Sequence, residues 1–582
     1  MVNTMKTRRE FLQEGGLASA GAMLAGMHPL SVAGLDTTNP SDARPNIIFI
    51  LADDMGFSDI GCYGSEIDTP NLDALAKGGL QFTDFHNSPR CCPSRAALMT
   101  GLYSHQAGMG MMVSDYGRYP YPAYAGDLSE KCVTIAEAVK SGGYTTMMTG
   151  KWHLTPWQTV GRHNYPLQRG FDRYYGIING AASYFDPISL TRDNDPIVVA
   201  KEDRDYYLTD AIGDQSMQFI DDAARQGKPF FLYAAFTAGH WPLMAPEETI
   251  AKYKGRYADG WDALRRARHA KQLSMGIVEP QWELTPRDPR VPLWEFASYH
   301  QWEQRRMEVY AAQIDKLDQN VGKIVAKLRQ LGILDNTMIC FMSDNGGNFE
   351  EAPIRRPGEE WPAEIPGATK DGLPLHPGND PSIMPGSATT WASYGIPWGN
   401  TSNTPFRLYK HYCHEGGIST PFIVHWPRGI KKGGVTHAIG HEIDVMPTCL
   451  DAAGVAYPAK SKAGTPPQPL EGESLLSVFE GRELGERSLF WEHEGNHAVR
   501  AGKWKLVSRF PDNWELYDME QDRSEMHNIA DEHPDQVKKM AGDYGAWAKR
   551  VGVQPWPMPE TPPGDTRTGA MILPQYLRRD RE

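Results

Sequence analysis

Residues 46–56 read NIIFILADDMG, a run of large apolar side chains that ends directly in two aspartates. A short apolar run rich in Ile and followed by a polar turn is typical of a strand buried on both faces of a parallel sheet. We therefore expect a strand at 46–51, with Asp53 and Asp54 at its carboxyl end.

Outward from this strand, apolar runs alternate with segments of helical periodicity. The pattern predicts the strands 81–86, 145–149, 229–236 and 337–342 and the helices 71–77, 94–99 and 302–331. This alternation indicates an α/β fold with a large, mostly parallel mixed sheet flanked by helices.

The character of the chain changes after the Pro-rich stretch 465–469. Short strands near 488–492 and 504–508 and a helix near 535–550 predict a smaller C-terminal α+β domain. We assign 44–470 to a catalytic domain and 471–582 to the C-terminal subdomain and tail. A Pro- and Gly-rich stretch at 350–400 predicts a long ordered loop over the site, whose Trp391, Tyr394 and Trp398 are candidates for substrate contact. Packing of the loop is the equal alternative for Trp391 and Trp398.

The first 33 residues are typical of an export signal. Arg8 and Arg9 precede a weakly apolar run at 15–26, which is too short to span a bilayer. We predict a twin-arginine signal peptide at 1–33, no membrane span, and a periplasmic or secreted protein. A disordered or cytosolic tail is the alternative.

Composition narrows the partners. The 582 residues carry a formal net charge of -13. Because binding to nucleic acid requires a cationic face, this charge argues against a nucleic-acid partner. Any anionic substrate must then meet a local cluster of positive charge.

Polar residues follow several of the expected strands. In open α/β sheets, ligands bind beyond the carboxyl ends of the strands, so side chains placed there should converge. The residues that satisfy this rule are Asp53, Asp54, Lys151, His153, His240, Asp344 and Asn345.

The loop after the strand 81–86 carries the most specific motif. Residues 91–101 read CCPSRAALMTG. This run closely resembles the signature of the type I sulfatases, C-x-P-S-R followed by x-x-L-x-T-G, which belong to the alkaline phosphatase superfamily. The resemblance extends from about residue 44 into the C-terminal domain and implies an alkaline-phosphatase-like fold and an arylsulfatase-type sulfuric ester hydrolase.

The resemblance implies that Cys91, and not Cys92, is oxidised to formylglycine by a formylglycine-generating or sulfatase-maturating enzyme. One hydroxyl of the hydrated aldehyde attacks sulfur and forms an enzyme-bound sulfate ester. Deprotonation of the other hydroxyl then expels sulfate. The alternative for Cys91 is an inert thiol beside a helix start.

The resemblance also implies a metal site. Asp53, Asp54, Asp344 and Asn345, together with the modified Cys91, would hold one Ca²⁺, and their oxygen ligands suit a hard cation. Mg²⁺ is the second choice. Taken alone, two adjacent aspartates would more often cap a helix or lie on a solvated surface, and the run Asp344-Asn345-Gly346-Gly347 reverses this balance.

Further motifs match the family's cationic shell. In G-K-W-H-L at 150–154, Lys151 would bind a sulfate oxygen and His153 would act as the base. His240 would be the acid, Lys410 a second sulfate-binding lysine, and Arg95 would hold the hydrated aldehyde. Outside this context, a lone histidine or lysine has a structural or solvated role. Ser183 is a weaker candidate, because its flanking residues do not match.

The expected reaction is hydrolysis of a sulfate monoester, on either an aryl sulfate or a sulfated carbohydrate, to alcohol and sulfate. One alternative is a phosphonate or phosphodiester hydrolase of the same superfamily. Those enzymes usually carry a histidine-containing metal set, whereas Asp344 and Asn345 have no histidine after them. The other is a non-catalytic binder of sulfated glycans, if Cys91 stays unmodified.

Overall fold

The computed structural model describes residues 44–113, 119–157, 161–352, 354 and 365–558. Its main feature is a ten-stranded mixed sheet in the order β13-β2-β12-β9-β1-β8-β4-β5-β6-β7. The strands are β1 (Asn46–Ala52), β2 (Leu80–Phe82), β4 (Thr145–Gly150), β5 (Arg173–Ile177), β6 (Leu190–Arg192), β7 (Asp195–Pro196), β8 (Phe230–Ala235), β9 (Thr337–Ser343), β12 (Phe422–His425) and β13 (Gly434–Thr436).

The centre of the sheet is parallel. β1 pairs in parallel with β8 and β9, and β4 pairs in parallel with β8 and β5, whereas β12 runs antiparallel to β9. Leu51 of β1 is in register with Ala235 and Met342. The carboxyl ends of these strands therefore meet at one edge, as the α/β prediction requires.

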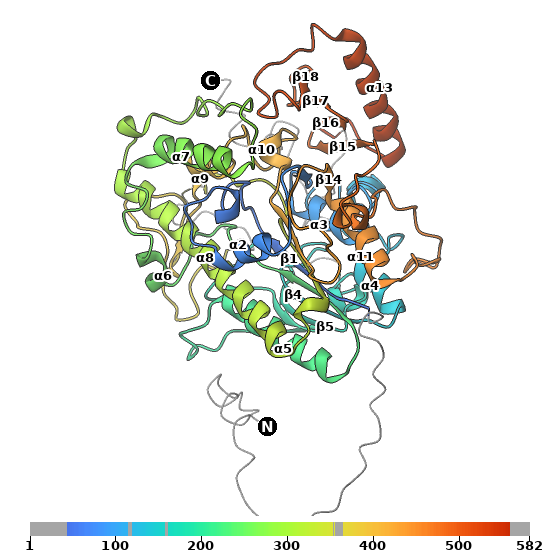
Figure 1. The fold of residues 1–582 in the computed structure, drawn as a ribbon. Helices are drawn as coiled ribbons and strands as arrows, with labels where there is room; N and C mark the ends of the chain where they lie inside the picture. Colours follow the sequence, from blue (N-terminus) through green and yellow to red (C-terminus); the bar gives the residue numbers. More distant parts are fainter. Residues whose placement is uncertain (1–43, 114–118, 158–160, 353, 355–364, 559–582) are drawn as a thin grey trace, which may run out of the picture.

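Helices cover both faces of the sheet (Figure 1). Alternate residues of β1 point to opposite faces, so Ile48 and Ile50 join one core and Ile47, Phe49 and Leu51 join the other. The first core includes side chains of α2 (Pro70–Lys77), α5 (Leu208–Arg225) and α8 (His300–Gln330). The second includes α3 (Cys91–Thr100), α4 (Ile135–Ser141) and α11 (Val445–Ala453).

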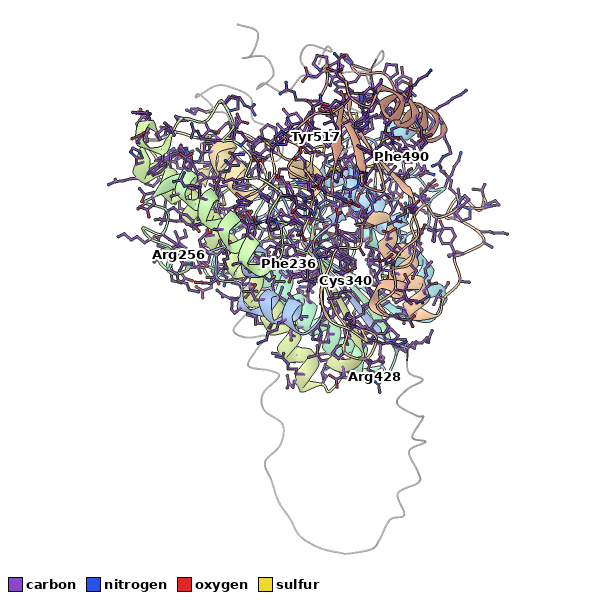
Figure 2. All side chains as sticks on the ribbon, turned by 45° about the horizontal axis from the view of Figure 1, so that its top comes forward. Phe236, Arg256, Cys340, Arg428, Phe490 and Tyr517 are labelled. Carbon is purple, nitrogen blue, oxygen red and sulfur yellow. The ribbon has the colours of Figure 1, made fainter. Side chains whose placement is uncertain are left out.

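A smaller subdomain follows at the C-terminal end, where Figure 1 shows α13 beside a separate small sheet. The sheet is antiparallel, in the order β15-β16-β17-β18. Figure 2 labels Phe490 and Tyr517 in this subdomain and Cys340 in the central sheet. The elements are β15 (Ser488–His493), β16 (Asn496–Ala501), β17 (Trp504–Ser508), β18 (Glu515–Asp518) and α13 (Pro534–Val551). The predicted α+β character is confirmed.

Buried charges join the two parts. Glu415, in the short helix α10 (Glu415–Ile418), accepts hydrogen bonds from Lys505 Nζ at 2.7 Å and Arg523 Nε at 2.9 Å. Both cations belong to the C-terminal subdomain, and Lys505 also pairs with Glu525. These side chains are almost fully buried, so their charges balance one another inside the protein.

Two predicted elements differ from the structure. The strand expected at 81–86 is divided into β2 and a separate β3 (Phe85–His86), because β3 leaves the main sheet to pair with β14 (Gly440–His441). The helix expected at 94–99 begins three residues earlier, at Cys91. The cysteine therefore lies at the N-terminus of a helix and not in a loop before it.

The remaining elements surround this framework. The stretch 350–400 is not without secondary structure, as its described part contains two short strands and a helix. These three elements are β10 (His376–Pro377), β11 (Thr390–Trp391) and α9 (Gly395–Ser402). Elsewhere in the chain lie α6 (Glu247–Ala251), α7 (Gly260–Met275) and α12 (Leu476–Phe479). Among the described residues, every helix is too short or too polar to cross a membrane. The predicted signal peptide at 1–33 lies outside the described residues.

Candidate active site

The two aspartates after β1 form the centre of the site. Both are fully buried, and Asp54 adopts a left-handed backbone conformation with φ 60°. Such a backbone is uncommon for a residue other than glycine and is frequent at functional sites. The backbone amide of Asp54 donates to the side-chain Oδ1 of Asp344 at 3.1 Å, so two predicted site residues join the ends of β1 and β9.

Helix α3 brings Cys91 to these aspartates. Cys91 Sγ lies 3.9 Å from Asp54 Oδ1. Burial raises the pKa of the Cys91 thiol to about 12, so the thiol is un-ionised at neutral pH. Cys92, by contrast, belongs to the hydrophobic core on one face of the sheet.

Arg95, one turn further along α3, is fully buried. Its Nε and Nη2 donate to Asp344 Oδ2 at 3.0 and 2.8 Å, and its Nη1 donates to the carbonyl oxygen of Lys151 at 2.8 Å. Arg95 thus ties the cysteine helix to the ends of β9 and β4. It supplies one positive charge beside the aspartates.

Two lysines add further positive charge. Lys151, which follows β4, donates from Nζ to Asp53 Oδ2 at 2.7 Å. Lys410 donates from Nζ to Asp54 Oδ2 at 2.8 Å. Burial alone would raise the pKa of Asp54, but the charge of Lys410 outweighs it and lowers that pKa to about 2. The site therefore holds a compact group of carboxylates and fixed cations.

Two buried histidines complete the set. Burial lowers the pKa of His240 to about 3, and burial together with Lys151 holds the pKa of His153 well below its usual range. Both rings are therefore neutral. His240 Nδ1 donates to the carbonyl oxygen of Trp241 at 2.6 Å, which leaves Nε2 facing Asp54 Oδ2 at 3.5 Å. His153 lies in the left-handed region, with φ 54°.

The acidic centre fits a hard cation. Asp53 Oδ1 and Asn345 Oδ1 are buried oxygen atoms without a hydrogen-bond donor, and such acceptors are costly to leave unpaired. Ligand atoms of Asp53, Asp54, Cys91 and His240 lie within 4.8 Å of one another. Burial and repulsion from Asp53 raise the pKa of Asp344 to about 6. A divalent cation with oxygen ligands would give the oxygens of Asp53 and Asn345 a partner and would reduce the repulsion between Asp53 and Asp344.

A cavity of about 180 Å³ opens at this centre. Cys91, Lys410, His153 and His240 belong to the buried part of its lining, and Met112, Val113, Trp157 and Trp241 are partly exposed. The candidate catalytic groups thus belong to the buried part, and apolar side chains together with Arg90 and Glu350 form the partly exposed rim. The other lining residues are Arg90, Thr155, Asn179, Gly180, Ala181 and Glu350.

Sequence reasoning missed several residues of this site. Asn348 donates from Nδ2 to Asp54 Oδ2 at 3.0 Å, and its position just after Asp344-Asn345-Gly346-Gly347 was an available signal. Arg90 and Glu350 form an ion pair of 2.8 Å within the cavity lining. No local pattern marked that pair, because its partners are far apart in sequence.

Three aromatic side chains proposed for substrate contact instead pack the interior. Trp391 and Trp398 are 1% and 0% exposed, and Trp398 Nε1 donates to the carbonyl oxygen of Glu303. Tyr394 is stacked on Tyr310 with ring centroids 4.5 Å apart. The hydroxyl of Ser183 accepts the amides of Phe185 and Asp186, and Ser183 is not among the residues lining the cavity.

Comparison with known proteins identifies the family. Residues 45–455 match the family model described as Sulfatase, which is more than half of the chain. The chain belongs to the sulfatase family. Residues 406–541 of this sulfatase also match the C-terminal region described as that of N-sulphoglucosamine sulphohydrolase.

Relatives of this sulfatase carry the same description. It is 31% identical to an uncharacterized sulfatase of Schizosaccharomyces pombe, over 88% of this chain and 94% of that one. It is 33% identical to the arylsulfatase of Klebsiella aerogenes, over 76% of this chain and 94% of the relative. These findings show that the chain is a sulfuric ester hydrolase.

A solved structure shows the same fold. The crystal structure of Ps i-CgsB in complex with k-i-k-neocarrahexaose superposes with a TM-score of 0.63 at 25% identity. The match covers 93% of this sulfatase and 100% of that chain. The fold, with its large sheet flanked by helices, is thus shared with this solved structure over nearly the whole of both chains.

Proposed function

We propose that Cys91 of this sulfatase is converted to formylglycine, whose hydrate attacks the sulfur of a sulfate monoester and releases the alcohol. The position of Cys91 carries the proposal: its side chain lies in the cavity, 3.9 Å from Asp54. A thiol with a pKa of about 12 is a poor nucleophile at neutral pH, because the thiolate is the reactive form. A modified side chain with hydroxyl groups avoids this difficulty.

The buried cations are assigned to the sulfate. Lys151 and Lys410 would bind sulfonyl oxygens, and Arg95 would hold the hydroxyls of the modified Cys91. Fixed positive charges in a buried site stabilise a developing negative charge more than the same charges do in water. In the site, Lys151, Lys410 and Arg95 are each paired with an aspartate, so these fixed cations are held in place in a chain whose overall charge is -13.

The two histidines are assigned opposite proton-transfer roles. His153 is neutral and can accept the proton of the second hydroxyl. His240 must first gain a proton before it can donate one to the leaving alcohol. The negative charge of a bound sulfate ester beside Nε2 would favour that gain.

Asp53, Asp54, Asp344 and Asn345 are assigned to one Ca²⁺, with Mg²⁺ as the second choice. The buried oxygens Asp53 Oδ1 and Asn345 Oδ1, which accept no hydrogen bond, support this assignment. When bound, the cation would polarise the S–O bonds and favour ionisation of the attacking hydroxyl. Metal analysis of the purified protein, with Asn345→Leu as the comparison, tests which ion is retained.

The substrate is assigned to aryl sulfates or to sulfates on one sugar ring. The arylsulfatase relative and the structural neighbour solved with an oligosaccharide support these two classes. The described lining encloses only about 180 Å³, which suits a single ring better than an internal segment of a polymer. A panel of 4-nitrophenyl sulfate and sulfated monosaccharides separates the two classes.

Peptide mass and turnover test the proposal together. The peptide that contains Cys91 should have the lower mass of an aldehyde, and the same preparation should hydrolyse 4-nitrophenyl sulfate. An active preparation that contains only the thiol would contradict the mechanism. Faster hydrolysis of a matched phosphonate monoester would instead favour the superfamily alternative, and sulfate binding without turnover would favour the glycan binder.

Export by the twin-arginine route is proposed for the intact chain. Arg8 and Arg9 followed by the apolar run 15–26 support it. Because this route carries folded proteins, Cys91 would be modified before export by a maturating enzyme. Fractionation of cells that express the wild type or the Arg8→Lys, Arg9→Lys double variant tests the route, with retention of the variant in the cytoplasm as the expected result.

A further inference from the structure

An ion pair lies within the lining of the active-site cavity and has no role in the mechanism above. Arg90 Nη1 lies 2.8 Å from Glu350 Oε1, and the side chains are 20% and 26% exposed. Both residues line the cavity with Cys91 and His240. Arg90 precedes Cys91 directly, as the N-cap residue of α3, so the pair is fixed close to the reacting group.

Glu350 is held firmly in this position. Its Oε2 accepts a hydrogen bond from Trp241 Nε1 at 2.8 Å and lies 3.9 Å from Lys410 Nζ. Burial would raise the pKa of Glu350, but Lys410 and Arg90 outweigh it and hold that pKa well below its usual range. The carboxylate is therefore ionised at neutral pH.

Arg90 retains capacity for another partner. Its Nε is a buried donor without a hydrogen bond, although Nη1 is engaged by Glu350. A guanidinium group offers a planar set of donors that suits carboxylate and sulfate oxygens. Without Glu350, Arg90 would thus be a ready receptor for an anionic group beside the reacting sulfate.

The cavity lining places this pair on the leaving-group side. Lys410 and Cys91 are the buried end, where the sulfate is assigned, whereas Trp241, Met112 and Val113 are partly exposed at the rim. The partly exposed Arg90 and Glu350 belong with the rim. An alcohol that leaves from the sulfate would extend past them.

We propose that Arg90 and Glu350 are specificity-determining residues that select substrates whose leaving group is neutral and bears hydroxyls. Glu350 neutralises Arg90 and so removes the attraction for a second anionic group. Together the two side chains still offer a donor and an acceptor to hydroxyls. This inference rests on the proposed sulfatase function and adds the charge of the preferred leaving group to it.

A matched pair of substrates tests the inference. 4-(Hydroxymethyl)phenyl sulfate and 4-carboxyphenyl sulfate differ in charge at one ring position, and their intrinsic reactivities cancel when variants are compared with the wild type. The readout is the ratio of kcat/KM for the neutral substrate to that for the anionic substrate. A variant that only displaces Lys410 would lower kcat/KM for both substrates and leave this ratio unchanged.

The two charge variants should move the ratio in opposite directions. Glu350→Gln exposes the charge of Arg90, so the ratio should fall about tenfold or more, because an unpaired guanidinium attracts the carboxylate. Arg90→Met exposes the charge of Glu350, so the ratio should rise by a similar factor. Arg90→Lys keeps the charge and should stay within about threefold of the wild type.

Three outcomes are distinguishable. Opposite shifts in the two variants support the inference. Equal losses on both substrates in both variants mean that the pair only maintains structure, and they overturn it. A wild-type enzyme that hydrolyses neither these esters nor 4-nitrophenyl sulfate counts against the proposed function itself, and the inference then falls with it.

Discussion

Lys410 Nζ lies 2.8 Å from Asp54 Oδ2, and both side chains are buried. The two residues are 356 positions apart, and only the folding of the sheet brings them together. Asp54 also accepts hydrogen bonds from Asn345 and Asn348. The pair links the charge balance of the acidic centre to the cations that are assigned to the sulfate.

Lys410→Met should damage both turnover and stability. Removal of one partner of a buried ion pair costs about 3–5 kcal/mol of unfolding free energy, because the other charge stays buried. Turnover of 4-nitrophenyl sulfate should fall by about 10²-fold or more through lost stabilisation of sulfate charge. Urea unfolding and steady-state kinetics measure the two effects. Lys431→Met, on the exposed Lys431–Glu480 pair, is the control and should change neither. Additive effects of Lys410→Met and Asp54→Asn would contradict direct coupling.

Cys91→Ala and Cys92→Ala should differ sharply. The first removes the residue to be modified, so turnover should fall on the order of 10³-fold or more. The second removes a core thiol that accepts the amide of Val113, so it should lower the thermal midpoint while turnover stays within about threefold. Steady-state kinetics measure the turnover of the two variants, and thermal melts measure their thermal midpoints. Equal loss of turnover in both would show that the wrong cysteine has been assigned.

Removal of the divalent cation should lower activity and stability together. A chelator would leave Asp53 Oδ1 and Asn345 Oδ1 without a hydrogen bond again, and ligand binding stabilises the folded state by mass action. We expect a lower thermal midpoint after chelation, restored by Ca²⁺ at lower concentration than by Mg²⁺. Asn345→Leu should blunt the response to Ca²⁺, whereas Asp68→Asn, at an exposed carboxylate, should not. Full activity in metal-free buffer would be incompatible with the proposed site.

Gly180→Ala should slow turnover with little loss of stability. A Cβ at this position would lie 2.4 Å from His153 Cε1, so the imidazole would have to move. Displacement of a catalytic group by about 1 Å can cost about 10²-fold in rate. The control is Gly542→Ala in α13, where nothing lies within 4 Å and the helix should gain stability. Unchanged kcat in Gly180→Ala would argue against His153 as the base.

The ion pairs of Glu415 with the C-terminal subdomain should make the free energy of unfolding depend on pH in the acid range. Burial alone would raise the pKa of Glu415, but Lys505, His86 and Arg523 outweigh it and hold that pKa well below 4.5. A depressed folded-state pKa contributes stability above the unfolded value, and the contribution is lost as the pH falls toward the folded value. The stability difference between wild type and Glu415→Gln should therefore be largest near pH 7 and shrink below about pH 4.5. Urea unfolding across this range measures it, and a difference independent of pH would exclude the ionic contribution.

The sequence predicted the framework of the fold well where periodicity was strong. The strand 46–51 and the helix 302–331 agree with β1 and α8 to within two residues. The strand 81–86 was wrong as one element, because Phe85 and His86 pair with a strand more than 350 positions away. A local sequence pattern does not indicate which distant strand will pair with a given segment.

The site was predicted where chemistry and position coincide in short motifs. Asp53, Cys91, Lys151 and Asp344 each stand at the end of a strand or the start of a helix, and the structure brings them together. For Trp391 and Trp398 the sequence left substrate contact and packing of the loop open, because an aromatic residue in a Pro- and Gly-rich stretch can face either solvent or core. Only the packing of that stretch against α8 and its neighbours buried them.

The sequence by itself determined the alternation of strands and helices and the choice of candidate catalytic groups, because both depend on residues that lie close to one another along the chain. The tertiary structure alone decided that Arg90 meets Glu350 and that Glu415 receives Lys505 and Arg523. Such contacts join segments without shared periodicity. Their strength depends on burial and on the distance between charges, and neither exists until the chain has folded.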